Sequence, residues 1–425
     1  MKYISTIFLA LCINTSFANP SISTISDNND YLYVEVNTLP IIDINISFKT
    51  GSSNDGELEG ISNIMLNTLM NSDVEGKKLA HYFENVGANL SYSTNRESMS
   101  INIRSLSDLT LVNRLSRLIN MSLRSDNIDL DVFELEKAKI LRNISQSDKE
   151  PGSILSKTIF ATVFKNTGLA HDVLGSYDKV DSITINQILN HRDKIISLNN
   201  VEINIVGNIK KFDATKIIAN LTNGFNLNPL NDRDDYIFSS NTKHIEFESN
   251  QSHIAVIIPT VSRSNKDYYN LLVANYIFGG SGFGSWLMEE IREKRGLSYS
   301  VYSYISSNKK NGYLKISLQT KNENDSLAKS IIFSQIDRFR NFNVSETDIE
   351  DAKNSILRSF DMRTDTNKKL LNLLSAINSL DLSINYFVDY KQKIKDVNLQ
   401  SIKSALNKSI DFTKISVISV GKTVE

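Results

Sequence analysis

The amino-acid sequence predicts an α+β fold made of two domains with the same plan. The chain has 425 residues, which exceeds one ordinary hydrophobic core and suits two domains of about 200 residues each. In each half, alternating strand segments precede long amphipathic helices, an order that favours an antiparallel-dominated sheet with helices packed on one face. A short segment also recurs, because residues 135–139 (LEKAK) resemble residues 349–353 (IEDAK). This similarity indicates a duplication.

In the first half, residues 31–50 alternate as strands do, and a polar glycine-containing loop follows. Helices are predicted near 60–70 and 77–86, where apolar residues recur at three- and four-residue spacing. Gly87 ends the second helix. The remaining predicted elements are a strand segment over 89–103 and helices near 109–122 and 131–146.

The second half repeats this order, with a strand at 253–259, a helix at 267–278 and a glycine-rich loop at 278–284. An amphipathic helix then ends at Gly296. Strands are predicted at 297–305 and 312–319, followed by helices near 323–340 and 346–361. A run of Asn, Asp, Pro and Arg over 226–235 predicts the linker. We therefore expect domains at 19–228 and 236–425.

Composition excludes several classes of protein. Hydrophobic residues make up 40% and charged residues 22% of the chain, which is typical of a globular protein. The net charge of −1 gives no indication of a nucleic-acid partner. No Gly-x-Ser-x-Gly motif, phosphate-binding loop or aspartic dyad is present. The five histidines lack a His or Cys at ligand spacing, so we expect them to be surface or packing residues.

The N-terminus resembles a secretory signal over residues 1–18. Lys2 precedes an apolar run from Ile4 to Ile13, and a small-x-small site ends at Ala18. The run is too short to span a bilayer, so we expect no transmembrane helix after cleavage and a periplasmic or secreted location. An uncleaved anchor and a lipoprotein formed through Cys12 remain alternatives. Cys12 is the only cysteine, so the mature chain would contain no disulfide and no thiolate ligand.

Residues 285–303 (SWLMEEIREKRGLSYSVYS) predict a helix, a glycine stop and a strand. Arg292 falls in the last turn of the helix. Tyr299 follows seven residues later, on the predicted strand and on the same face as Leu297 and Val301. Basic residues at a helix C-terminus and tyrosines in strands also have an ordinary structural explanation. The combination behind a glycine-rich loop resembles the C-terminal signature of pitrilysin/insulinase-type zinc peptidases.

This resemblance covers nearly the whole mature chain and implies a fold of two peptidase-like domains. It also implies that Arg292 hydrogen-bonds the substrate backbone and that Tyr299 donates to the scissile carbonyl as its oxyanion develops. The family's edge strand beside the zinc helix, where extended substrate adds as a further strand, corresponds to residues Asn89, Leu90 and Ser91. An ordinary edge strand is the alternative. Gly279 and Gly280, in the glycine-rich loop, are expected to shape the substrate cleft and to bind substrate.

The family's zinc motif, His-x-x-Glu-His, corresponds to Asn63, Ile64, Met65, Leu66 and Asn67. Asn63 and Asn67 keep the spacing of one helical turn, but a carboxamide is a poor zinc ligand. Leu66 cannot act as a general base. The later ligand position falls near Asn143, and the nearest upstream acid, Glu136, is interpreted as a helix-surface charge. The chain itself is therefore expected to hold no metal.

These features predict the non-zinc subunit of a two-chain periplasmic or secreted metallopeptidase. A zinc-bearing subunit of the same family would be the partner and would supply the metal and the general base, and the substrate would be a peptide. The chain would then be inactive alone. Two alternatives remain: a catalytically inactive pseudo-peptidase that serves as a scaffold or peptide-binding protein, and a self-sufficient enzyme with a displaced metal site.

Overall fold

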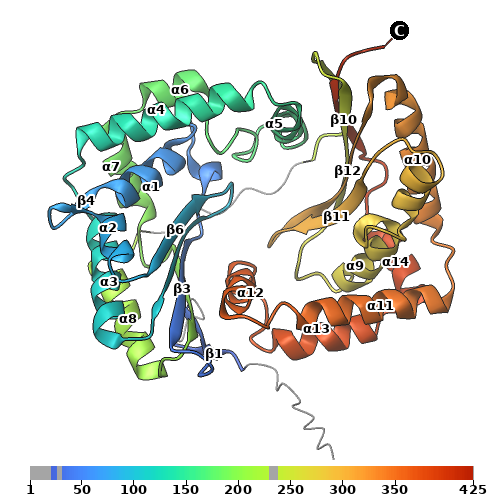
Figure 1. Ribbon diagram of the computed structural model, residues 1–425. Helices are drawn as coiled ribbons and strands as arrows, with labels where there is room; N and C mark the ends of the chain where they lie inside the picture. The colour runs from blue at the N-terminus through green and yellow to red at the C-terminus, as the bar shows by residue number, and fades with distance from the viewer. Residues whose placement is uncertain (1–20, 26–30, 229–237, 425) are drawn as a thin grey trace, which may run out of the picture.

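The computed structural model describes residues 21–25, 31–228 and 238–424. The predicted signal segment, Cys12 and positions 229–235 of the predicted linker lie outside these residues. The described chain forms two large sheets, each accompanied by long helices, and a two-stranded sheet of β4 (Asp73–Val74) and β5 (Lys77–Lys78). This arrangement confirms the predicted α+β class (Figure 1).

The first sheet has the strand order β1-β2-β8-β3-β7-β6. Its strands pair antiparallel except for β2 and β8, which run parallel. The strands are β1 (Ser23–Thr24), β2 (Tyr31–Glu35), β3 (Ile41–Phe48), β6 (Asn89–Thr94), β7 (Met99–Leu106) and β8 (Val201–Gly207). The helices of this half are α1 (Ile61–Asn71), α2 (Leu79–Glu84), α3 (Leu109–Leu123), α4 (Leu130–Ser147), α5 (Pro151–Val163), α6 (Tyr177–Ser182), α7 (Ile185–Ile195) and α8 (Lys211–Thr222).

The second sheet has the order β11-β12-β10-β13-β9, with β13 and β9 parallel and the other pairs antiparallel. The strands are β9 (Thr242–Glu246), β10 (Gln251–Val261), β11 (Val301–Ser307), β12 (Asn311–Lys321) and β13 (Ser416–Gly421). The helices are α9 (Tyr268–Asn275), α10 (Asp325–Asn341), α11 (Glu346–Asp361), α12 (Asn367–Ser379), α13 (Tyr386–Lys395) and α14 (Leu399–Ser409), with π-helical turns η2 (Tyr276–Gly280) and η3 (Met288–Glu293).

The two sheets repeat one topology, because β2-β8-β3-β7-β6 has the same order and the same single parallel pair as β9-β13-β10-β12-β11. The sequence repeat lies in α4 and α11, which follow α3 and α10 in their respective halves. Each copy forms an ion pair three residues apart, Glu136 with Lys139 and Glu350 with Lys353, both at 2.6 Å. These observations support the predicted duplication.

One helix of each half packs on the sheet of the other half. Leu155 and Ile159 of α5 join a core cluster with Ala255 and Ile257 of the second sheet. Conversely, α12 contributes Leu370, Leu371 and Leu374 to a cluster that contains Leu32, Val34 and Val206 of the first sheet. Burying each of these side chains contributes about 1.5–3 kcal/mol. We call the sheet face that carries the exchanged helix its inner face.

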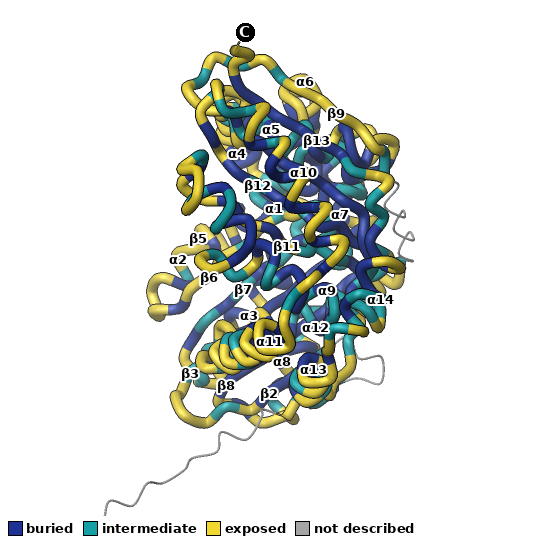
Figure 2. Tube along the Cα trace, turned by 90° about the vertical axis from the view of Figure 1, so that its right-hand side faces the viewer, coloured by how far each residue is buried: buried dark blue, intermediate teal, exposed yellow. Residues whose placement is uncertain are grey.

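The helices that belong to each sheet cover one of its faces, as predicted. The exchanged helix adds partial cover on the inner face, which the sequence did not indicate. Figure 1 shows α5 beside β10 and α12 beside β3. In Figure 2, β12 and β13 are largely buried, whereas α11 and α13 present exposed sides. Within the described residues, no helix is both long and apolar enough to cross a membrane.

Candidate functional site

The helix α1 carries the positions that correspond to the zinc motif. Ile64, Met65 and Leu66 are buried, whereas Asn63 and Asn67 are partly exposed. Asn67 Nδ2 donates to the backbone oxygen of Asn63 at 2.8 Å and lies 3.3 Å from Asn63 Oδ1. The carboxamide of Asn67 is therefore committed to a bond along the helix.

This row of amides continues to the edge strand. Asn71 Nδ2 donates to the backbone oxygen of Asn67 at 3.0 Å and to the Tyr92 hydroxyl on β6 at 2.8 Å. Burial raises the pKa of Tyr92, and the Glu136 carboxylate raises it further. Neutral hydrogen-bonding groups thus connect the positions that correspond to the zinc motif on α1 with the edge strand β6.

The later ligand position, Asn143, is exposed on α4. Glu136 is only 4% exposed, and its Oε1 lies 2.6 Å from Lys139 Nζ. The interpretation of Glu136 as a surface charge is therefore wrong, because the carboxylate faces inward and the lysine reaches in to pair with it.

These side chains do not fit a zinc ion. Two neutral carboxamides, a buried leucine and an exposed asparagine supply neither the imidazole and carboxylate donors that zinc prefers nor a base for a bound water. Across the part of the chain that the structure describes, no cluster of three or more His, Cys, Asp or Glu side chains could hold a metal ion.

A second polar group, which the sequence did not indicate, lies at the N-terminus of α1. Asp55 accepts hydrogen bonds from the backbone nitrogens of Gly60, at 2.8 Å, and Ser62, at 3.2 Å. His191 Nε2 lies 2.9 Å from Ser62 Oγ and 3.9 Å from Asp55 Oδ1. Because these partners come from sequence positions far apart, no local motif could have revealed the group.

This group is not a nucleophilic triad. Ser62 is fully buried, so no substrate can reach its hydroxyl. The same ring nitrogen, Nε2, faces both the hydroxyl and the carboxylate, whereas a triad needs one nitrogen for each. Burial lowers the pKa of His191 to about 4 and raises that of Asp55 to about 6. The group holds α1 in place.

The structure brings Arg292 and Tyr299 together. The guanidinium carbon of Arg292 lies 4.9 Å from the centre of the Tyr299 ring and 4.5 Å from that of Phe283. Both rings project into solvent, with Tyr299 85% and Phe283 71% exposed. Phe283, in the glycine-rich loop, was not singled out from sequence, although an aromatic between Gly282 and Gly284 was a signal that could have been used. The three side chains form an exposed cluster of aromatic rings around a cation.

Neighbouring basic residues behave differently. Lys294 Nζ lies 2.8 Å from Glu289 Oε1, and Arg295 Nη1 lies 2.6 Å from Glu290 Oε2. Among the described carboxylates, none forms an ion pair with Arg292. The structural explanation for basic residues at a helix end therefore accounts for Lys294 and Arg295, while the Arg292 charge stays available to a ligand.

Two expectations about this segment need correction. Residues 288–293 form a π-helical turn rather than a regular α-helix, and β11 begins only at Val301. Tyr299 therefore lies in the connecting segment. It does not share a face with Leu297 and Val301, because Val301 is fully buried whereas Tyr299 is exposed. Leaving the strand frees the phenol to project outward beside Arg292.

The two glycines proposed to bind substrate lie at the end of η2. Gly279 is buried, and a Cβ atom there would lie 2.5 Å from Ser303 Oγ and 2.6 Å from Leu287 Cδ1. Close packing between η2 and β11 explains this glycine. Gly280 is exposed, but a Cβ there would lie 2.7 Å from Asn275 Nδ2. This geometry favours a packing role for Gly279 over the proposed substrate contact.

The strand that contains Asn89, Leu90 and Ser91 is an edge strand, as expected. β6 is the last strand of the first sheet, and among the described strands it pairs with β7 alone. It also packs beside α1. Asn89 and Ser91 are exposed, whereas Leu90 is partly buried. One side of this strand can therefore accept a further extended chain.

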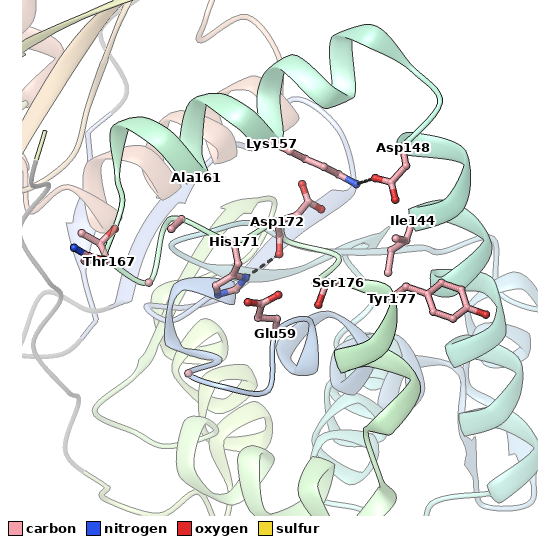
Figure 3. A pocket seen from close by; sticks show the side chains of 15 residues that line it. Glu59, Ile144, Asp148, Lys157, Ala161, Thr167, His171, Asp172, Ser176 and Tyr177 are labelled. Atoms are coloured by element: carbon pink, nitrogen blue, oxygen red, sulfur yellow. Dashed lines mark hydrogen bonds and ion pairs between the residues drawn. The ribbon is translucent and has the colours of Figure 1, made fainter. Parts of the chain in front are cut away.

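A cavity of about 730 Å³ lies beside the segment that leads into α1 and the end of α4 (Figure 3). It holds an ion pair between Lys157 Nζ and Asp148 Oδ1 at 2.7 Å, and His171 Nδ1 donates to the backbone oxygen of Asp172 at 2.9 Å. None of Asn63, Asn67, Arg292 and Tyr299 lines it. We therefore do not assign it to the candidate site.

The fold and site define a class of protein: a duplicated α+β chain that places Arg292 beside Tyr299 and lacks the metal ligands of zinc peptidases. Residues 33–176 match the family described as Insulinase (Peptidase family M16), and residues 182–356 match the Peptidase M16 inactive domain. The chain belongs to the M16 peptidase family, and it is a non-zinc member of that family.

Individual relatives agree with the assignment to this family. A Helicobacter pylori protein described as a non-peptidase homolog, YmxG, is 25% identical over 386 residues, which cover 87% of each chain. An uncharacterized zinc protease of Rickettsia felis is 25% identical over 311 residues, 70% of this chain and 74% of that protein. The crystal structure of a peptidase M16 inactive domain from Pseudomonas fluorescens superimposes with a TM-score of 0.88 at 26% identity, covering 96% of this chain and 98% of that one.

Proposed function

We propose that this protein is the non-zinc subunit of a secreted or periplasmic heteromeric metallopeptidase. The exposed cluster of Arg292 and Tyr299, with an arginine free of carboxylate partners in the described chain, is the observation that carries the proposal. A partner chain of the same family would supply zinc and the general base, since the residues on α1 and α4 do not fit a metal.

In this arrangement Arg292 would bind carbonyl oxygens of the substrate backbone, because a guanidinium offers several donors in a fixed plane. Tyr299 would donate its hydroxyl proton in a hydrogen bond to the carbonyl oxygen of the scissile bond. That bond strengthens as negative charge develops on the oxygen, so it lowers the barrier selectively in the transition state. Neither side chain can activate water, so the isolated chain would not cleave peptides.

The test is reconstitution with a family member that carries the intact zinc motif, followed by peptide-cleavage kinetics. Tyr299→Phe should lower kcat by about 10²–10³-fold, as loss of one oxyanion donor does. Arg292→Ala should mainly raise KM. Arg295→Ala is the matched control, because Arg295 is paired with Glu290 and should leave both constants near those of the wild type. Unchanged cleavage in Arg292→Ala and Tyr299→Phe would reject the proposal.

A non-catalytic peptide-binding or scaffold function is the second candidate. The Helicobacter pylori relative described as a non-peptidase homolog and the open edge of β6 favour it. Under this function, peptides would bind the isolated chain, but no zinc-bearing partner would become more active in its presence. The secreted or periplasmic location rests on residues 1–18, and N-terminal sequencing of the exported protein should give Asn19 as its first residue.

A further inference from the structure

The inner face of the second sheet is only partly covered. The register of β11, β12 and β10 forms two rows of directly paired residues across the sheet. One row contains Tyr302, Ser317 and Ala255, and the other contains Tyr304, Lys315 and Ile257. Paired residues on neighbouring strands share a face. Because α5 packs on Ala255 and Ile257, these rows lie on the inner face, and they extend beyond α5 to the end of the sheet. We call Tyr302, Tyr304, Lys315 and Ser317 the tyrosine shelf.

The two tyrosines of the shelf are parallel and exposed. Their ring centres lie 6.5 Å apart with planes 17° from parallel, and 48% of Tyr302 and 39% of Tyr304 are exposed. Side chains on one face of an extended peptide repeat every ~6.6–6.8 Å. A peptide in strand conformation can therefore place side chains two positions apart over successive rings.

The shelf also carries a cation without an acidic partner. Lys315 Nζ lies 5.9 Å from the centre of the Tyr304 ring, and no described carboxylate forms an ion pair with it. Burial lowers the pKa of Lys315. Tyr302 lies three residues after Tyr299, whose ring borders the unpaired Arg292. A ligand with carboxylates beside apolar groups would complement these charges.

The edge of β11 is less available than that of β6. Asn275 Nδ2 donates to the backbone oxygen of Ser303 at 3.2 Å, and Ser303 Oγ donates to Asn275 Oδ1 at 2.7 Å. Gly279 also packs against Ser303. Contacts with Asn275 and Gly279 thus block the addition of a further strand near the middle of β11. A peptide would therefore bind on the face of the sheet and not at this edge.

We propose that the tyrosine shelf binds extended peptides that carry apolar side chains two positions apart and flanking carboxylates. The tyrosine-shelf proposal deepens the proposed function by naming a class of peptide. It rests on the proposed function only in treating Arg292, which lies near the shelf, as part of the same peptide-binding surface. Binding itself needs neither the partner nor the metal.

The experiment measures fluorescence anisotropy of labelled peptides with the isolated mature chain. The probe is Asp-Ser-Phe-Ser-Phe-Ser-Asp. One comparison peptide, Asp-Ser-Ser-Phe-Phe-Ser-Asp, has the same composition but puts its rings on opposite faces. Another, Lys-Ser-Phe-Ser-Phe-Ser-Lys, reverses the charge. We expect the probe to bind at least five-fold more tightly than either.

Substitutions then locate the site. Tyr302→Thr combined with Tyr304→Thr keeps strand-forming residues and should weaken probe binding at least ten-fold, whereas Lys315→Gln should remove the preference for acidic over basic peptide. Tyr177→Thr is the matched control, because Tyr177 is 49% exposed and lines the separate cavity. Circular dichroism and the urea midpoint establish that each variant is folded.

Equal binding of the probe and its rearranged isomer would overturn the proposal, as would undetectable probe binding at millimolar concentration or unchanged binding by the double tyrosine variant. These measurements involve no cleavage and leave Tyr299 intact. They can therefore fail while the test of Arg292 and Tyr299 in the reconstituted peptidase succeeds.

Discussion

The guanidinium carbon of Arg292 lies 4.9 Å from the centre of the Tyr299 ring, although the two residues belong to different local structures. Arg292 leaves a π-helical turn, whereas Tyr299 lies in the segment that precedes β11. The π-turn matters because it changes the direction in which residues near its end project relative to a regular α-helix. Phe283 completes the cluster at 4.5 Å from the same carbon.

Phe283 and Arg292 should therefore be energetically coupled. A double-mutant cycle with Phe283→Ala and Arg292→Ala, measured by urea unfolding, should give a coupling of about 0.5–1 kcal/mol, as expected for an exposed cation–π contact. Phe212→Ala paired with Arg292→Ala is the control, since Phe212 is also 71% exposed but lies over Lys216. Equal coupling in both cycles would contradict the contact.

Metal content should distinguish this chain from members of its family that keep the zinc motif. The purified mature chain should hold less than stoichiometric zinc by elemental analysis, because Asn63, Asn67 and Asn143 offer only carboxamides. Replacing Asn63 and Asn67 with histidine should raise zinc retention, since two imidazoles one turn apart can share an ion. This variant leaves the buried Leu66 in place and so avoids burying a charge. One zinc per wild-type chain would refute the prediction.

Much of the local structure could be predicted from sequence because local patterns determine it. The apolar repeat over 61–71 fixed the buried face of α1, and Gly87 marked the end of a helical segment. The resemblance to the peptidase signature implied that Arg292 and Tyr299 act together, and the structure places the two side chains next to each other. The extent of the strand before Val301 was overestimated, because alternation does not distinguish a strand from an unpaired extended segment.

Long-range features were not predictable in the same way. An amphipathic pattern shows that α5 and α12 must each bury one side, but it does not indicate which sheet each helix covers. The packing of each helix on the sheet of the other half could therefore not be predicted. Likewise, Asp55 and His191 meet through the fold of the whole first half. The inward orientation of Glu136 depends on Lys139 reaching it, which composition alone does not determine.

Gly279 should be required for close packing of η2 on β11. Gly279→Ala should lower the free energy of unfolding by about 1–3 kcal/mol, because the new methyl group would overlap Ser303 Oγ and Leu287 Cδ1 unless the backbone shifts. Gly152→Ala is the matched control in the first turn of α5. Its nearest neighbour would be His253 Nδ1 at 3.8 Å, an ordinary contact, so stability should stay equal or rise by up to about 1 kcal/mol. Urea denaturation measures both, and equal losses would contradict the packing argument.

His191 should make stability depend on pH in a defined direction. Burial lowers the pKa of His191 from 6.5 to about 4. Between pH 6.5 and pH 4, the imidazole is therefore protonated in the unfolded chain but stays neutral in the folded chain. The contribution of His191 to stability is therefore complete above pH 6.5 and is lost as the pH falls towards 4. Asp55 acts in the opposite sense. Its pKa is raised from 3.8 to about 6 by burial, so its contribution is complete below pH 3.8 and is lost as the pH rises to about 6.

In the wild type, the pH dependence of stability that comes from His191 opposes the one that comes from Asp55. In His191→Gln, only the pH dependence from Asp55 remains. The free energy of unfolding of the wild type, minus that of the variant, should increase between pH 4 and 6.5 by at most about 3 kcal/mol and then level off. Urea titrations at several pH values provide the measurement. Ile188→Val, a buried change on the same helix that removes no titrating group, should give a constant offset. A pH-independent difference for His191→Gln would show that the imidazole does not resist protonation in the folded protein.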